Sequence, residues 1–239
     1  MQIELAYLGV EVNDVDGLAA VLGGVAGLIP GEAHDGVATW RNDDRAQRIL
    51  VTEGPADDAT VIGFEVPSSD AAAAVADRLT SLGYEVAEAG AADCVSRRVD
   101  GMWKTVSPWG TPVEIVHGLA LSNPGESFGS ELVRGGFKTD GVGFGHCVFM
   151  VADAEAADRF VVEGLGMRQT DWIELHHCSR RGSCGPLLPL QSATPHAGAD
   201  RSAGTAARED DASRDVRDRR ARRCRSCVRP GLRRRSPDP

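Results

Sequence analysis

The sequence lacks the long apolar runs and the basic leader that mark membrane and secreted proteins. No window of the 239 residues has the ~18 consecutive apolar residues that a membrane-spanning helix needs. No basic segment precedes an apolar core as in a secretory signal, because the first basic residue is Arg41. Cys94 and Cys147 are the two cysteines within residues 1–175, too few for a disulfide framework. We therefore expect a cytoplasmic protein with reduced thiols and no membrane contact.

Charge and apolar side chains are unevenly distributed along the chain. Residues 1–175 carry 11 basic and 28 acidic residues, whereas residues 176–239 carry 15 arginines, no lysine and 7 acidic residues. The second segment also holds four of the six cysteines and lacks Phe, Tyr, Trp, Ile and Met. A segment of this composition cannot bury an ordinary apolar core. We therefore expect residues 176–239 to be a disordered Arg/Pro-rich tail, and residues 1–175 to fold.

A strand followed by a capped helix recurs three times in the folding part. Each copy has a run of strand-forming residues, then polar residues that can cap a helix, then apolar residues at helical spacing that end at Gly or Pro. The capping residues lie at 13–16, at 68–70 and at Asp153, and the helices are expected to end at Pro30, Gly83 and Gly166. The strand runs are 5–12, 61–66 and 143–151, and the helical stripes run from Leu18 to Leu28, from Ala72 to Leu82 and from Ala157 to Leu165.

Further strands are expected after the first two helices. They lie near residues 36–41, 46–53, 84–88, 94–99, 102–107 and 112–117. The repeating unit is therefore βαβββ, and a repeat of this size buries its sheet by pairing with a copy of itself. We expect an α+β fold with a complete pair of modules in residues 1–118, a linker rich in Gly, Ser and Asn at 119–142, and the start of a second pair at 143–175.

Three motifs in a fixed order carry a resemblance to a known family. They are Tyr7-Leu8-Gly9-Val10-Glu11-Val12, Pro108-Trp109-Gly110-Thr111-Pro112-Val113-Glu114-Ile115, and Gly143-Phe144-Gly145-His146 with a capped helix and Leu165-Gly166 behind it. With these motifs, residues 1–175 resemble the type I extradiol ring-cleavage dioxygenases of the vicinal oxygen chelate superfamily. The resemblance implies a glyoxalase-like fold of paired βαβββ modules, with a complete N-terminal pair that binds no metal and a C-terminal pair that is truncated in this sequence.

The resemblance also implies a reaction and a metal ligand. Family members use Fe(II) and O2 to cleave a catechol, such as 2,3-dihydroxybiphenyl or a steroid-derived catechol, in aromatic catabolism, and they are homo-oligomers. By resemblance His146 is the first of three iron ligands, and a second His and a Glu belong to the fourth module. Two imidazoles and one carboxylate bind Fe(II) on one face and leave positions for both catechol oxygens and O2.

The sequence departs from the family after Leu175, where no fourth module is recognisable. Two of the three ligands are then missing, so we expect this chain to be an inactive or truncated copy that does not hold the iron itself. Our hypothesis is a shift of reading frame near residues 176–187, which would place the tail out of frame. The alternative is a non-catalytic vicinal-oxygen-chelate protein that binds a small apolar ligand or a partner protein.

Six other side chains of the folding part receive structural interpretations. Glu114 and Tyr7 stand where the N-terminal counterparts of the ligand Glu and of His146 would fall, and we expect Glu114 to be a solvated carboxylate at a strand end. His34 and His117 are expected on the surface. Cys94 and Cys147 are expected to pack as small apolar residues.

The truncated second pair and the tail lead to three further expectations. Without a partner module, the apolar face of Phe160, Val161 and Leu165 should be exposed. A zinc site built from the tail residues His176, His177, Cys178, Cys184, Cys224 and Cys227 is a weak alternative, because a single CxxC lacks a strand context. Specific nucleic-acid binding is not expected, because no aromatic residue accompanies the tail arginines.

Overall fold

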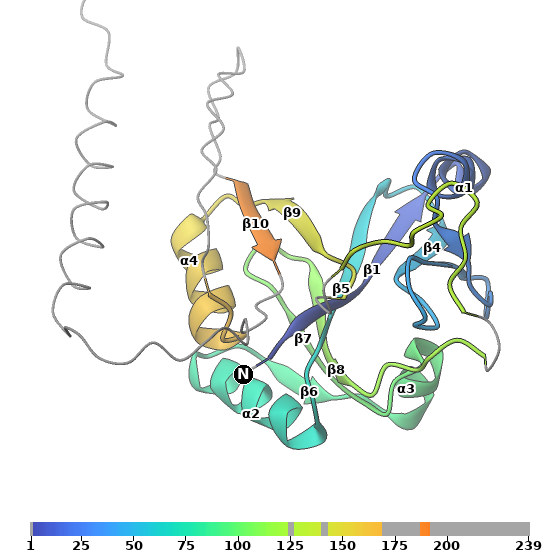
Figure 1. Ribbon diagram of the computed structural model, residues 1–239. Helices are drawn as coiled ribbons and strands as arrows, with labels where there is room; N and C mark the ends of the chain where they lie inside the picture. The colour runs from blue at the N-terminus through green and yellow to red at the C-terminus, as the bar shows by residue number, and fades with distance from the viewer. Residues whose placement is uncertain (1, 124–126, 140–142, 169–186, 192–239) are drawn as a thin grey trace, which may run out of the picture. The chain divides into compact units, whose positions relative to one another are not determined.

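The structure of the chain is a computed structural model, which describes residues 2–123, 127–139 and 143–168 and the backbone of 187–191. The described residues all belong to one compact unit, residues 1–196 (Figure 1). Apart from residues 187–191, which form a strand, the predicted tail and its possible zinc ligands lie outside the described residues. Within the described part, no helix combines the length and the apolar character needed to cross a bilayer.

Two βαβββ modules share one eight-stranded sheet, with the strand order β2-β3-β4-β1-β5-β8-β7-β6. The first module consists of β1 (Glu4–Val12), α1 (Val15–Gly24), β2 (Ile29–Pro30), β3 (Ala38–Arg41) and β4 (Ile49–Glu53). The second consists of β5 (Asp58–Glu65), α2 (Ser69–Ser81), β6 (Val86–Glu88), α3 (Ala91–Arg97), β7 (Gly101–Val106) and β8 (Pro112–His117).

The two modules repeat the same pairing on either side of a central seam. β1 runs parallel to β4, and β5 runs parallel to β8 in the same way. β1 and β5 are antiparallel and join the modules, and they lie side by side in the middle of the sheet (Figure 1). The predicted α+β fold of paired βαβββ modules is therefore confirmed.

The predicted helix caps are formed by the residues that the sequence indicated. The carboxylate of Asp14 accepts a hydrogen bond from the backbone N–H of Gly17 at 2.8 Å, and the Ser68 hydroxyl accepts one from the N–H of Ala71 at 3.2 Å. Each cap satisfies a backbone donor that the first helical turn leaves free. Gly83, placed at the end of the second helix by the sequence, has a positive φ of 91°, which favours glycine.

The predicted strand at residues 94–99 is wrong, because residues Ala91–Arg97 form the helix α3. Arg98 ends this helix in the left-handed conformation, with φ 54°. Val95, a residue type common in strands, is 76% exposed and does not contribute to a buried strand face. Local β-propensity therefore gave the wrong result for a short segment that has few apolar residues to bury.

A third module begins with β9 (His146–Met150), α4 (Ala154–Asp158) and the π-helix η1 (Arg159–Gly164). β10 (Leu187–Gln191) pairs antiparallel to β9. The carboxylate of Asp153 caps α4, as predicted, by accepting hydrogen bonds from the N–H groups of Glu155 and Ala156 at 3.0 Å each. The third strand–cap–helix copy that the sequence indicated is thus present.

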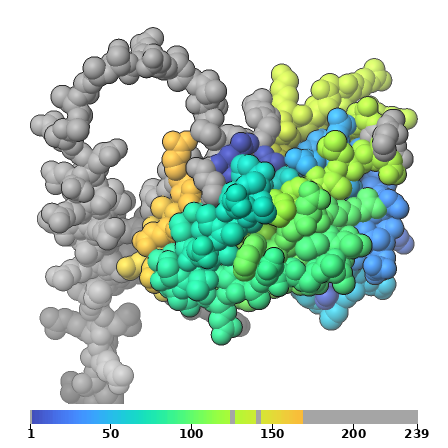
Figure 2. All heavy atoms as spheres, turned by 90° about the horizontal axis from the view of Figure 1, so that it is seen from below, coloured from blue at the N-terminus to red at the C-terminus, as the bar shows by residue number. Residues whose placement is uncertain are grey.

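The expectation that the apolar face of Phe160, Val161 and Leu165 is exposed is wrong, because all three side chains are buried. They join the apolar cluster beneath α2, and the α4–η1 segment lies against α2 (Figure 2). The Phe160 ring meets the rings of Tyr84 and Trp109 edge to face, with centroids 5.0 and 5.7 Å apart. The outer face of the second module therefore supplies the surface that a partner module was expected to supply.

Polar contacts fix the end of η1 on the same helix. The Arg78 side chain on α2 donates from Nε to the carbonyl of Gly164 at 3.1 Å and from a terminal nitrogen to that of Leu165 at 3.3 Å. A side chain at Gly164 would come within 2.5 Å of a methyl group of Leu79. The absence of a side chain at this position therefore lets η1 approach α2 closely.

Replacing Phe160 with alanine should detach the third module from α2. The loss of a buried aromatic side chain costs about 3–5 kcal/mol. We expect Phe160→Ala to lower the melting temperature and to speed protease cleavage within residues 143–168. Val162→Ala, which alters a partly exposed side chain of the same helix, is the control and should change little. Equal behaviour of the two variants would contradict this packing.

Candidate functional site

His146, the predicted metal ligand, begins β9 and is exposed to solvent. Because side chains alternate along a strand, His146 shares its face with Val148 and Met150, which are 50% and 74% exposed. Cys147 and Phe149 point to the opposite face and pack against the apolar cluster beneath α2. His146 therefore stands on the open face of β9, away from the core that holds the strand in place.

The chain segment just before His146 is fixed by a contact with the first module. The backbone N–H of Phe144 donates to the carbonyl of Leu5 on β1 at 2.9 Å. Gly143 has a positive φ of 70°, and a side chain there would meet the same carbonyl at 2.3 Å. The glycine of the Gly143-Phe144-Gly145-His146 motif is therefore required where the chain passes over β1.

The described residues do not form a metal site around His146. Within residues 2–123, 127–139 and 143–168, no group of three or more His, Cys, Asp or Glu side chains is close enough together to hold a metal ion. One exposed imidazole does not fit the three-ligand Fe(II) site that the resemblance implies. Any further ligand to a metal at His146 would have to come from residues outside the described part.

Glu114 is buried, so the expectation of a solvated carboxylate is wrong. Its residue is 5% exposed, and its Oε2 accepts a hydrogen bond from the Tyr7 hydroxyl at 2.6 Å. The same oxygen accepts one from Nε of Arg97 at 2.8 Å. Arg97 comes from α3, the helix that the sequence did not reveal. Because α3 packs against the sheet at β7 and brings Arg97 to Glu114, the strand-end carboxylate is an interior group.

The charges of this cluster balance within it. Burial and the neighbouring charge of Glu114 raise the pKa of the Tyr7 hydroxyl well above its usual value, so the phenol stays protonated and acts as a donor. Burial opposes the charge of Arg97, but the hydrogen bond and the negative charge of Glu114 raise the pKa of the guanidinium. The cluster therefore holds a carboxylate, a guanidinium and a neutral phenol.

Two histidines and two cysteines complete the comparison with the sequence. His34 and His117 are half-buried rather than on the open surface, and Nε2 of His34 lies 3.4 Å from Oε1 of Gln47. Cys94 and Cys147 are free thiols packed against apolar clusters, as predicted. Burial raises the pKa of the Cys147 thiol to about 12, so it is an unreactive packing residue.

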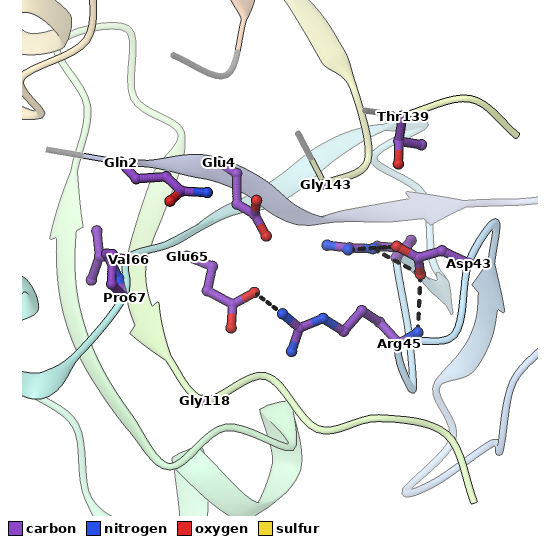
Figure 3. A pocket seen from close by; sticks show the side chains of 11 residues that line it. Gln2, Glu4, Asp43, Arg45, Glu65, Val66, Pro67, Gly118, Thr139 and Gly143 are labelled. Carbon is purple, nitrogen blue, oxygen red and sulfur yellow. Dashed lines mark hydrogen bonds and ion pairs between the residues drawn. The ribbon is translucent and has the colours of Figure 1, made fainter. Parts of the chain in front are cut away.

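A polar cleft of about 490 Å³ lies where the modules meet, and no sequence motif indicated it (Figure 3). The side chains of Arg45 and Glu65 form an ion pair across it at 3.3 Å. The buried guanidinium of Arg48 pairs with Asp43 at 2.6 Å and donates to a carbonyl of β1. The cleft is lined by Gln2, Glu4, Asp43, Arg45, Arg48, Glu65, Val66, Pro67, Gly118, Thr139 and Gly143.

Glu4 brings a third carboxyl group to this cleft, beside Asp43 and Glu65. It lies directly opposite Glu65 in the antiparallel pairing of β1 with β5. Partial burial raises the pKa of Glu4, and the charge of Glu65 raises it further. Cross-strand carboxylates repel each other, so the pair is most stable when Glu4 is protonated.

Comparison with known proteins adds the family context. Residues 5–54 match the family model described as dihydroxybiphenyl dioxygenase BphC D1. The chain is 36% identical over 172 residues to 3-methylcatechol 2,3-dioxygenase of Pseudomonas putida, which covers 71% of this chain and 58% of that protein. It resembles the extradiol ring-cleavage dioxygenases, as its sequence motifs predicted. The identity to biphenyl-2,3-diol 1,2-dioxygenase of Paraburkholderia xenovorans is 33% over 175 residues, 72% of this chain and 57% of that protein.

Solved structures share the fold over the matched part of the chain. The halotolerant catechol dioxygenase BphC superimposes with a TM-score of 0.67 at 26% identity, covering 73% of this chain and 58% of that one. A Mn(II)-bound glyoxalase from Novosphingobium aromaticivorans, with a TM-score of 0.57 at 18% identity over 72% of this chain and 56% of that one, shows the shared glyoxalase-like fold. The chain spans a little over half the length of the dioxygenases that it matches.

Adding a methyl group at Gly63 should disturb the Tyr7 cluster. A Cβ at this position would come within 2.4 to 2.7 Å of three atoms of the buried Tyr7 ring, which has no free space to move into. We expect Gly63→Ala to cost about 1–3 kcal/mol of folding free energy, measured by urea denaturation. Gly24→Ala is the control, because the new carbon would meet no atom within 4 Å beyond its chain neighbours and the backbone of its own helix. Similar losses in both variants would contradict this account.

Stability should fall as Glu4 ionises. A carboxyl group with a pKa that is raised by folding contributes its stability below the unfolded pKa and loses it as the pH rises through the folded pKa. We expect Glu4→Gln to raise the melting temperature above the wild-type value at pH 7.5 and to match it at pH 4. Glu88→Gln, at an exposed carboxylate on β6, should give no such divergence. Parallel pH profiles for Glu4→Gln and wild type would refute the repulsion between Glu4 and Glu65.

Proposed function

We propose that the chain functions in the extradiol cleavage of a catechol by O2. The observation that carries the proposal is the 33–36% identity to two enzymes named for this class of substrate, over about 72% of the chain, together with the shared fold. Those two relatives are named for 3-methylcatechol and biphenyl-2,3-diol, and a third, from Sphingobium xenophagum, for 1,2-dihydroxynaphthalene. The shared chemistry of these compounds is an aromatic ring with two adjacent hydroxyl groups.

The proposed cofactor is Fe(II), and His146 is its proposed ligand in the described part of the chain. When bound, the metal would hold the catechol oxygens and O2 together. His146 suits the role because its imidazole is exposed on the open face of β9 while the other face is held rigidly by the core. A second and a third ligand from outside the described residues are required, since one imidazole does not retain Fe(II) in water.

Several sequence-based expectations remain predictions alongside this proposal. They are the domain limits at 1–118, 119–142 and 143–175, the homo-oligomeric state, the cytoplasmic location and the frame shift. The expectation that this chain is inactive is the opposite of the proposal, and the experiment below decides between the two. The substrate is proposed no more finely than a catechol with a substituent or a fused ring beside the diol, such as 2,3-dihydroxybiphenyl.

Iron retention and ring cleavage should depend on His146. The full chain is reconstituted anaerobically with Fe(II), freed of excess metal, and supplied with 2,3-dihydroxybiphenyl and O2. The proposal predicts about one iron per chain and a yellow ring-opened product, both lost in His146→Ala and both kept in His117→Ala. His117 is the matched control, a half-buried histidine on β8 of the N-terminal pair.

A chain that retains no iron and gives no colour would overturn the proposal for this polypeptide. That outcome is the one expected from an inactive copy, and it would favour the non-catalytic alternative. Iron and colour that survive in His146→Ala would instead reject His146 as a ligand while leaving the reaction in place.

A further inference from the structure

Helix α3 is attached to the sheet by polar contacts rather than by apolar burial. None of its seven residues is buried, and Gly90 at its N-cap offers no side-chain hydrogen bond. Cys94 is half-buried against the core, whereas Val95 is 76% exposed. An isolated helix of this length does not form in water, so the contacts with the sheet must hold it.

Those contacts are concentrated at the C-terminal end of the helix. Arg97 places Nε 2.8 Å from the buried Oε2 of Glu114, and its carbonyl accepts a hydrogen bond from Nε2 of the fully buried Gln47 at 2.8 Å. Outside this point, Asp93 pairs with Lys104 at 2.7 Å, and Arg98 pairs with Glu32. Asp93 and Glu32 are exposed, so the Arg97–Glu114 pair is the one shielded from water among these three.

The side chains of Tyr7 and Glu114 beneath α3 form an anionic group whose position is fixed by the surrounding residues. The hydroxyl of Tyr7 is oriented toward Glu114 at 2.6 Å and toward the thioether of Met102 at 3.9 Å. Gly63 leaves just enough space for the Tyr7 ring. If Arg97 were withdrawn, a carboxylate would remain inside the protein without a counter-charge, which is strongly unfavourable.

We propose that Tyr7 and Glu114 form a cation-binding site of the N-terminal module pair, and that the chain fills it with its own Arg97, so that α3 is a lid held by this guanidinium. The site takes planar guanidinium cations, which can donate to a carboxylate oxygen. It does not suit a metal ion, since one carboxylate and a protonated phenol provide too few ligands. The lid is the part of this pair that can open while the sheet stays intact.

The test is chemical rescue of Arg97→Ala by ethylguanidinium. We expect this variant to melt at least about 5 °C below wild type, because a buried carboxylate loses its partner. Ethylguanidinium at about 20 mM should recover part of this loss. The comparison is made at matched salt, and this concentration is low enough to leave other charges little affected. It should give no recovery in Arg97→Ala/Glu114→Gln, where the carboxylate is removed.

Arg98→Ala is the matched control, because Arg98 is adjacent in sequence but pairs with an exposed carboxylate. It should melt within about 2 °C of wild type and gain nothing from ethylguanidinium. If Arg97→Ala does not fold, the proposal still predicts that the double variant is more stable than Arg97→Ala. Equal losses in Arg97→Ala and Arg98→Ala, or rescue that persists without Glu114, would overturn it.

Hydrogen exchange tests the lid in the otherwise wild-type chain. In Glu114→Gln the guanidinium loses its charged partner, so amides of residues 91–97 should exchange on the order of tenfold faster, while those of α2 keep their rates. Unchanged exchange in α3 would reject the lid. Equally faster exchange in α3 and α2 would show a general loss of stability and would also reject it.

Discussion

The antiparallel pairing of β1 with β5 is the interaction on which the rest of the described structure depends. It joins the two modules into one sheet and sets the register of their facing residues. Tyr7 lies opposite Gly63, so the aromatic ring meets a residue without a side chain, while Glu4 lies opposite Glu65. A shift of one residue would turn each of these side chains to the other face of the sheet. The buried Tyr7 cluster and the polar cleft are therefore both consequences of one register.

The same strand β1 also receives the third module. The carbonyl of Leu5 accepts the N–H of Phe144, and Phe160 buries its ring on the outer side of the second module. The first contact fixes where β9 begins, and the second fixes the helix behind it. His146 is thus held on a rigid strand whose other face is occupied, which leaves its imidazole open for chemistry.

The sequence predicted the features that local chemistry determines. The caps at Asp14, Ser68 and Asp153 and the glycine at Gly83 are set by residues a few positions away, so the three strand–helix openings could be recognised. The motifs around Tyr7 and His146 also led to the correct family resemblance. These local predictions were correct because a helix cap or a turn requires the same residue types in any tertiary context.

What the sequence missed depends on contacts between distant residues. Glu114 was interpreted as solvated because the resemblance gives the N-terminal pair no metal to bind. The segment 94–99 was interpreted as a strand, so the helix that brings Arg97 to Glu114 was not foreseen. Phe160 was expected to be exposed because its packing partner was sought in an absent module, whereas the rings of Tyr84 and Trp109 provide the contact.

The two sites also differ in how their charges are balanced. Glu114 is neutralised by Arg97 within the N-terminal pair, whereas His146 meets no carboxylate among the described residues of β9. The first site is therefore closed by the chain itself, and the second requires groups from beyond the described residues to become a metal centre.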